Sequence, residues 1–183
     1  QDAGPLTGCL ALSDGIYSQG DYSGPMWTAS DSAGATPTGA SSISPSCGGG
    51  TCFTTKAEVS GVAAKIPTIN GSPDYSGTWG VIVGWDLNNR PDGGPAATAD
   101  LTGKTAITVG LAGADTLPLR IQLGVLSADE KSTTTFCANL TLSGGRATVP
   151  LNTLKAQCWQ SGGATFNPAT MKPSNLSLQV VPS

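Results

Sequence analysis

The chain has 183 residues, of which only 11% are charged, and it combines 25 Gly and 13 Pro with no His. A formal net charge of -3 leaves no basic field to hold a phosphate backbone, which argues against a nucleic-acid partner. No apolar run approaches the roughly 18 to 20 residues that cross a bilayer, so no membrane partner is expected. The length suits one core of ordinary size, and we predict a single domain over residues 1–183.

Short alternating segments and turns follow one another along the first half of the chain. A strand running into a turn is predicted over residues 8–15, and the segment 21–27 follows it. Small and polar residues dominate from 31 to about 52, which predicts a long surface loop. Residues 52–69 resume an alternating pattern and lead to a turn at 70–73. This spacing favours strands over helices.

The segment 78–88 predicts a strand with two unlike faces. One parity carries the large apolar side chains and is expected to face the core: Trp79, Val81, Val83, Trp85 and Leu87. The other parity carries Gly84 and Asp86. We therefore expect both tryptophans to be core residues, unless a bulge at Gly84 turns Trp85 towards the opposite face.

The segment 117–125 alternates with the period of a half-buried strand. Its inward parity consists of Leu119, Ile121 and Leu123. Arg120 and Gln122 would stand side by side on the other face, where a planar guanidinium next to an amide suits ligands rich in hydroxyl groups. The alternative is the solvated outer face of an ordinary sheet.

The second half of the chain adds strands predicted over 105–111, 134–142, 147–151 and 176–180. A turn at 143–145 predicts a hairpin between its two flanking strands, and 151–159 could hold the one short helix. Asn139 and Gln179 fall on the outward parity of their strands. About eight to ten short strands separated by turns predict an all-β protein with an antiparallel sandwich.

Five cysteines in a polar chain without His favour disulfide bonds and an oxidising compartment over a zinc site. Cys47 and Cys52 flank a Gly-rich loop, and Cys137 lies across a turn from Cys158, so we expect these two bridges. Cys9 is then a buried thiol or a point of attachment, unless it pairs with Cys47 or Cys52 instead. The cysteines therefore predict a secreted protein. The first thirty residues lack the pattern of a signal peptide, which indicates a mature or trimmed product.

From about residue 77 onward, the order of features resembles the jelly-roll carbohydrate-binding modules with a galactose-binding-domain-like fold that bacteria attach to polysaccharide-degrading enzymes. The resemblance rests on residues 79–80, 85–88, 100–103, 119–122, 147–151, 158–159, 166–168 and 176–180. Residues 13–15, 25–27 and 30–31 are similar to the opening of extracellular domains from cell-wall-degrading bacteria. The resemblance implies a jelly roll whose concave sheet face holds a sugar.

Carried over by position, the resemblance implies a groove lined by outward side chains: Asp86, Arg120, Gln122, Asn139 and Gln179. Trp85 is the sixth candidate, if it is turned towards the groove. Neither Trp79 nor Trp85 falls on the groove side by parity, so the loop residue Trp27 is the other candidate for stacking on a sugar ring.

The resemblance also implies a structural calcium ion at the sheet edge, with Asp14 and Asp31 as candidate ligands. The opening of this chain lacks the Glu that many relatives place near Asp14. No other cofactor is expected to be required.

The resulting hypothesis is a non-catalytic, monomeric module that binds a plant or microbial cell-wall polysaccharide, of β-glucan or xylan type, as an appendage to a catalytic domain. The absence of His excludes Ser-His and Cys-His catalysis, and Asp86 is the one acid expected in mid-sheet. We therefore predict that the protein is not an enzyme. The alternatives are a structural or adhesive extracellular domain that binds a protein and a glycoside-acting enzyme that uses a carboxylate pair.

Overall fold

The computed structural model describes residues 11–13, 16–19, 22–31, 41–46, 53, 57–74, 77–88, 97–114, 116–129 and 131–182. Strands make up 49% of these residues, and no α-helix occurs among them. The protein is therefore all-β, as the turn-rich, strand-like sequence predicts. No helix in the described ranges is long and apolar enough to cross a membrane.

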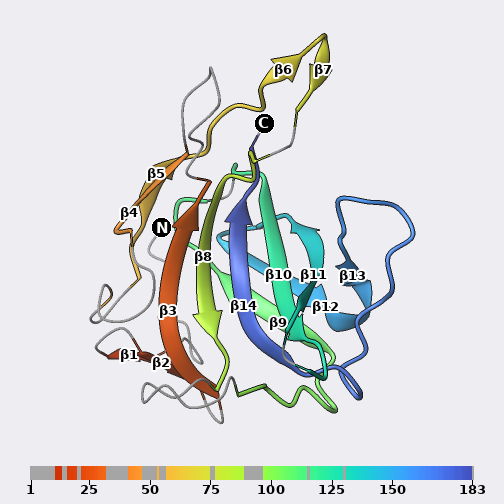
Figure 1. Cartoon of the computed structure of the whole chain (residues 1–183). Helices are drawn as coiled ribbons and strands as arrows, with labels where there is room; N and C mark the ends of the chain where they lie inside the picture. Colours follow the sequence, from red (N-terminus) through yellow and green to blue (C-terminus); the bar gives the residue numbers. More distant parts are fainter. Residues whose placement is uncertain are drawn as a thin grey trace.

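A single large antiparallel sheet organises the fold (Figure 1). Its strand order is β1-β2-β3-β8-β14-β10-β11-β13, and every neighbouring pair is antiparallel. The strands are β1 Ala11–Ser13, β2 Ile16–Gln19, β3 Tyr22–Ser30, β8 Val81–Asp86, β14 Pro173–Val180, β10 Leu119–Leu126, β11 Thr133–Leu140 and β13 Lys155–Ala156. Strands distant in sequence thus become neighbours, and β14 from the end of the chain lies between β8 and β10.

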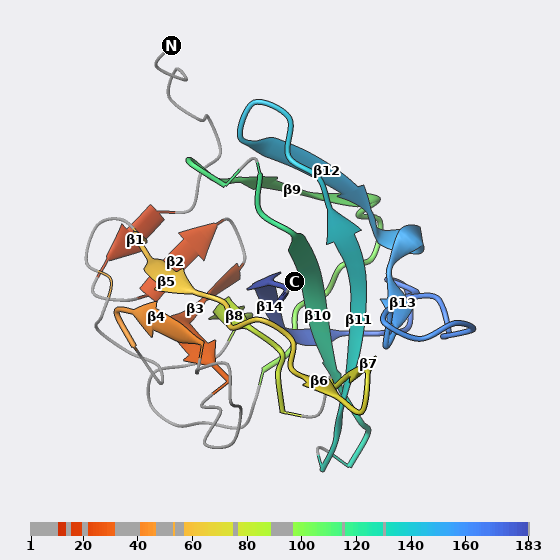
Figure 2. The ribbon, with the colours of Figure 1, turned by 90° about the horizontal axis from the view of Figure 1, so that it is seen from above.

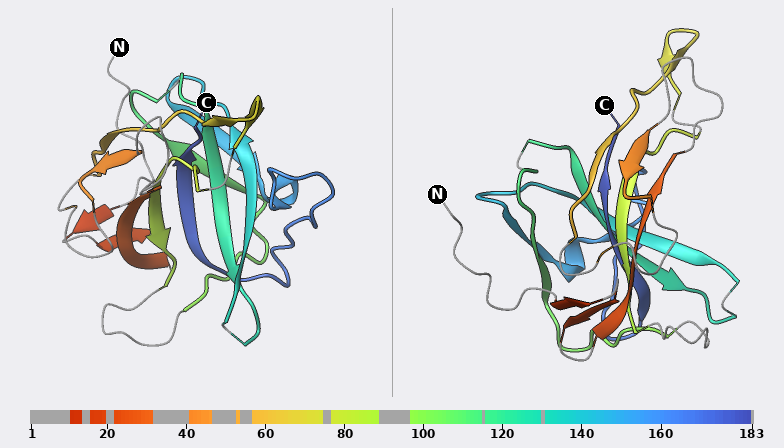
Figure 3. Two further views of the ribbon diagram at one scale, coloured as in Figure 1. Left: turned by 45° about the horizontal axis from the view of Figure 1, so that its top comes forward. Right: turned by 90° about the vertical axis from the view of Figure 1, so that its left-hand side faces the viewer.

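The second layer is a two-stranded sheet that lies across one side of the large sheet (Figures 2 and 3). It pairs β9 Ala106–Gly110 with β12 Arg146–Pro150. The core is a single hydrophobic cluster to which both layers contribute, including Met26, Trp85, Val109, Leu119, Ile121, Leu123, Phe136, Val149 and Leu178. The two layers are consistent with a β-sandwich of unequal sheets.

Two small hairpins accompany these layers. Strands β4 Ser42–Ser44 and β5 Ser60–Val62 pair beside β3, and β6 Thr68–Ile69 and β7 Ser72–Pro73 form an arm beyond the end of the sheet (Figure 1). Asn70 and Gly71 join β6 to β7 with φ of 51° and 80°. Two consecutive positive φ angles fit the tightest hairpin turns, and this confirms the turn predicted at 70–73.

The strand expected at 117–125 is confirmed as β10. Ile121 and Leu123 are fully buried and Leu119 is nearly so, because their parity faces the second layer. The inward positions predicted for β11 and β14 are also in the core, with Phe136, Leu140 and Leu178 buried. Alternation along a strand was therefore sufficient to orient the central strands.

The predicted hairpin between 134–142 and 147–151 is wrong. β11 pairs with β10 along its whole length and with β13 at Phe136 and Cys137, and it forms no ladder with β12. β12 crosses to the second layer and pairs with β9, where Val149 is buried against the core. The short helix expected within 151–159 is confirmed only as a 3-10 turn at Leu151–Thr153, because β13 begins at Lys155.

Two further expectations need correction. Trp79 precedes β8 and is 36% exposed, because the chain turns at Gly80 with a φ of 93° before the strand begins. The loop expected from 31 to 52 contains a strand, β4, in which Ile43 is buried. Residues 32–40 and 47–52 of that loop lie outside the described ranges.

Candidate functional site

The side of the large sheet turned away from β9 and β12 carries most of the candidate ligand-binding residues, and we call it the polar face. Strand register brings its side chains together in rows. One row runs from Trp27 through Gly84, Ser177 and Gln122 to Cys137. The adjacent row runs through Ile82, Gln179 and Arg120 to Asn139. Four strands thus contribute polar groups to one surface.

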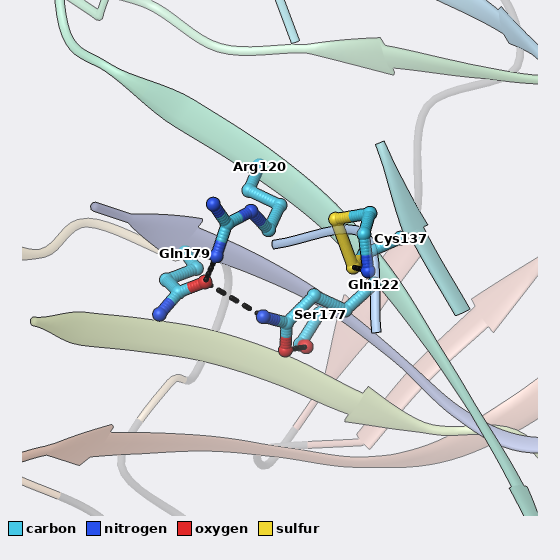
Figure 4. The surroundings of a disulfide bond; sticks show 6 residues. Arg120, Gln122, Cys137, Ser177 and Gln179 are labelled. Carbon is cyan, nitrogen blue, oxygen red and sulfur yellow. Dashed lines mark hydrogen bonds between the residues drawn. A yellow bond between two sulfur atoms is a disulfide. The ribbon is translucent and has the colours of Figure 1, made fainter. Parts of the chain in front are cut away.

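Gln179 is the centre of a hydrogen-bond network on this face (Figure 4). Its Oε1 accepts from Arg120 Nη1 at 3.3 Å and from Gln122 Nε2 at 2.7 Å, and its Nε2 donates to the carbonyl of Trp79. Ser177 Oγ donates to Gln122 Oε1 at 3.3 Å. Gln179 is only 4% exposed and holds Arg120 and Gln122 in position. The prediction that Gln179 is exposed in the groove is therefore wrong.

Arg120 is half-buried, and much of its hydrogen-bonding capacity is unused. Its Nε is buried and has no hydrogen-bond partner, and its guanidinium carbon lies 5.8 Å from the centre of the Trp159 ring. Burial lowers the pKa of Arg120, because the charged form loses hydration. The guanidinium remains charged at neutral pH, and a cation over an indole ring is held by about 0.5 to 1 kcal/mol at a partly exposed site.

A disulfide bond between Cys137 and Cys158 holds the neighbouring Trp159 beside Arg120. It is the pairing predicted from the spacing of these two cysteines. Cys137 lies on the polar face of β11, beside Gln122, so the bond ties the segment after β13 to that face (Figure 4). The amide of Gln157 also donates to the carbonyl of Thr135 at 2.9 Å. Trp159, at 51% exposure, is thereby presented to solvent beside Arg120.

Trp27 is the second aromatic ring on the polar face. It lies in β3, and its Nε1 donates to Asp86 Oδ1 at 2.8 Å. The ring covers Gly84, where an added Cβ would overlap its atoms, so only glycine leaves room for it. The prediction that Trp27 lies in a loop is wrong, because the residue belongs to β3, where its neighbour Met26 is buried and Gly84 lies opposite.

Trp85 does not contribute to the polar face. It is 8% exposed and belongs to the core cluster, as its parity predicts. β8 pairs in unbroken register with β3 and β14, so no bulge turns Trp85 towards the polar face. Trp85 is therefore not one of the ligand-binding residues of this face. Asn139 is exposed on β11, and Asp86 is half-buried next to Trp27.

Asp31 has a different role from the predicted calcium ligand. Its carboxylate is 2% exposed and accepts from the backbone amides of Ser41 at 3.1 Å, Trp79 at 2.7 Å and Gly80. Calcium requires a shell of oxygen ligands, whereas these neighbours are N–H donors. The described surroundings of Asp31 therefore do not fit a calcium ion, and no group of three His, Cys, Asp or Glu residues gathers elsewhere in the described ranges.

Four predicted residues cannot be placed. Asp14, the second candidate calcium ligand, lies outside the described residues, as do Cys9, Cys47 and Cys52. The bridge between Cys47 and Cys52 therefore stays a prediction.

Two hollows lie away from the polar face. One of about 300 Å³ is lined mainly by apolar side chains, including Ile43, Val59, Leu117 and Val180, where β4 and β5 meet the end of the sheet. The other, of about 410 Å³, lies beside Val125 and Met171. Neither hollow is lined by a residue of the polar face.

Comparison with protein-family models, with curated protein sequences and with solved structures found no match.

Proposed function

We propose that this protein is a non-catalytic carbohydrate-binding module whose ligand lies on the polar face between Trp27 and Trp159. The observation that carries the proposal is the presence of two tryptophan rings on one sheet face with Arg120 and Gln122 between them. β8 and β10 are separated only by β14, so their backbones lie about 10 Å apart. A chain of a few sugar residues could contact both rings.

The chemistry of this surface suits sugars. Indole rings offer flat apolar area for the C–H faces of a pyranose, and such rings keep a polar edge for hydrogen bonding. Arg120 has five N–H donors, of which one contacts Gln179, and Asn139 offers an exposed amide. Because the network around Gln179 already fixes Arg120 and Gln122, little ordering is needed when a ligand binds.

We further propose a jelly-roll fold of the galactose-binding-domain-like kind, in a secreted protein. Two unequal antiparallel layers support this fold, and the disulfide bond supports an oxidising compartment. In this proposal the module acts as a monomer appended to a polysaccharide-degrading enzyme. Cell-wall polysaccharides are its proposed ligands.

Binding without catalysis is favoured by the distribution of acids. A glycosidase of the common type needs two carboxyl groups across the bond that is cleaved. Within the described residues, the Oδ1 of Asp86 already accepts a hydrogen bond from Trp27, and the carboxylate of Asp31 is 2% exposed and accepts from three backbone amides. The pair is therefore incomplete on this surface.

One observation favours the alternative of a protein partner. Val59, Val62 and Leu117 are 43%, 63% and 43% exposed close to the hollow between β5 and the end of the sheet. Exposed apolar side chains grouped around a hollow are typical of surfaces that bind proteins. No residue of the polar face lines this hollow, so the two functions can be tested separately.

The proposal is tested by screening the protein on an array of plant and microbial polysaccharides, followed by isothermal titration with the ligand that the array selects. We expect a dissociation constant between micromolar and millimolar, equivalent to roughly 4 to 8 kcal/mol. Arg120→Ala should weaken binding by about 1.5 to 3 kcal/mol, because charge-assisted hydrogen bonds are lost. Arg146→Ala, on the exposed outer side of β12, is the matched control and should bind like the wild type.

The outcomes separate the candidate functions. Equal affinities of the wild type and Arg120→Ala would place the sugar site elsewhere. Cleavage of the selected polysaccharide during the titration would favour an enzyme. Binding to no polysaccharide, together with loss of a protein partner after Val62→Asp, would favour the adhesive alternative.

A further inference from the structure

The charge distribution around Arg120 indicates which class of sugar the polar face would bind. Arg120 carries a full positive charge at a half-buried position. Its neighbours on the face are the neutral amides of Gln122, Gln179 and Asn139 and the ring of Trp159. Among the described residues, the hydrogen bond of its guanidinium goes to the neutral amide of Gln179.

Two acids border this face, and neither pairs with Arg120. The buried carboxylate of Asp31 accepts hydrogen bonds from the backbone amides of Ser41, Trp79 and Gly80. Asp86 lies two strands away and four residues further along β8 than Ile82, the residue in register with Arg120. Sheet spacings place the two residues about 16 Å apart. Charges separated by more than about 8 Å are largely screened at physiological ionic strength. Asp86 also already accepts a hydrogen bond from Trp27.

The chain around this site is free of acids over a long stretch. No Asp or Glu occurs from Lys131 to the end of the sequence, although the whole protein has a net charge of -3. This stretch supplies β11, β13, β14 and the segment that carries Trp159. Lys155 of β13 pairs with Cys137 and shares the parity of the polar face, and its Nζ donates to Thr165. An anion at Arg120 would therefore meet no repelling carboxylate on these strands.

We infer, on the basis of the proposed function, that the ligand is an acidic polysaccharide and that a uronate carboxylate of the sugar chain pairs with Arg120. A guanidinium binds a planar carboxylate with two parallel N–H bonds. The terminal nitrogens of Arg120 supply such donors, and the one contact that they make within the protein is from Nη1 to Gln179 at 3.3 Å. A partly dehydrated cation pairs with an anion more strongly than a solvated one, because fewer water contacts have to be broken.

The test uses polygalacturonate, alginate and glucuronoxylan, each beside its carboxyl-reduced form, which has the same backbone without the charge. Affinity electrophoresis and isothermal titration measure binding at 50 mM and 500 mM NaCl. We expect at least one uronate polymer to bind about tenfold or more tightly than its reduced form, and this preference should shrink at high salt.

Variants assign the preference to one residue. Arg120→Gln should remove the difference between acidic and reduced polymers, whereas Arg120→Lys should keep part of it because the charge remains. Arg146→Gln makes the same change of net charge on the second layer and should leave the preference intact. Thermal unfolding of each variant shows whether it is folded.

Each other outcome overturns the inference in a recognisable way. Equal binding of acidic and reduced polymers contradicts it and leaves the proposed sugar site standing. Tighter binding of a sulfated polysaccharide than of any uronate would assign Arg120 to sulfate. No binding to any polymer, acidic or neutral, contradicts both the inference and the proposed function.

Discussion

The two ends of the polar face hold their tryptophans in different ways. At the strand-held end, Trp27 belongs to β3, covers Gly84 and donates to Asp86. At the disulfide-held end, Trp159 follows β13 and is kept beside Arg120 by a covalent bond from the preceding residue to β11. The first arrangement is built from strand register, and the second depends on the oxidation of two thiols.

This difference separates two sources of preorganisation. A ring in a paired strand loses most of its freedom when the sheet forms, so it needs no further constraint to present its surface. A ring on an irregular segment needs an external tie, which the disulfide bond between Cys137 and Cys158 provides. The strand-held end should therefore keep its geometry in reducing conditions, while the disulfide-held end should not.

The largest expected effect comes from removing that tie. The double variant Cys137→Ala and Cys158→Ala should lose about 3 kcal/mol of stability, since the bond closes a separation of 21 residues. It should also lose the contribution of Trp159 to binding, while Trp27 stays in place. Urea unfolding of the oxidised wild type, the reduced wild type and the variant measures the change. Identical unfolding curves of all three proteins would contradict the predicted stabilisation by the disulfide bond.

The next effect compares the two rings directly. Trp27→Ala and Trp159→Ala should each weaken sugar binding by about 2 kcal/mol, or about 30-fold, if both rings contact the ligand. Trp79→Ala is the control, because this ring is also exposed but its backbone carbonyl is the part that holds Gln179. Titration of the three variants with one polysaccharide decides the matter. If only one of the two tryptophan variants lost affinity, the ligand would contact only that end of the polar face.

A smaller effect tests how the strand-held end is assembled. Gly84→Ala should weaken binding by about tenfold, because the new Cβ overlaps the Trp27 ring and forces it to move. Gly124→Ala makes the same change on the same face, where the Cβ meets the flexible side chain of Asn175, and should leave affinity nearly unchanged. Titration together with near-ultraviolet circular dichroism reports both ring position and binding. Equal affinities of the two variants would show that Trp27 need not lie over Gly84.

The smallest effect concerns Tyr17, which is buried near the strand-held end. Its hydroxyl has no hydrogen-bond partner in the described structure, and burial raises its pKa, with the charges of Asp86 and Tyr22 adding to the shift. The unfolded chain releases this proton above about pH 10 while the folded protein retains it, so stability should fall as the pH rises further.

Tyr17→Phe should remove this pH dependence. At pH 7 the variant should differ from the wild type by less than about 1 kcal/mol, because the unpaired hydroxyl adds little to the folded state. Urea unfolding at pH 7 and pH 11 compares the two proteins. A wild type and variant with the same loss of stability at pH 11 would show that Tyr17 is not the group responsible.

The sequence by itself determined which side of each central strand faces the core. Alternation in β10, β11 and β14 assigned Ile121, Phe136 and Leu178 correctly, because a strand has a period of two and burial selects one parity. The same pattern placed Arg120 and Gln122 on one outer face, and the spacing of Cys137 and Cys158 indicated their bond. These features depend on residues close together in the chain.

Only the tertiary structure decided which strands are neighbours and which rings meet the polar face. β12 crosses to the second layer and pairs with β9, and β14 enters between β8 and β10 from the end of the chain. Gln179 is buried because Arg120 and Gln122 converge on it from an adjacent strand. Trp27 and Trp159 share one face through strand pairing and a disulfide bond, and such long-range contacts leave no periodic signal in the sequence.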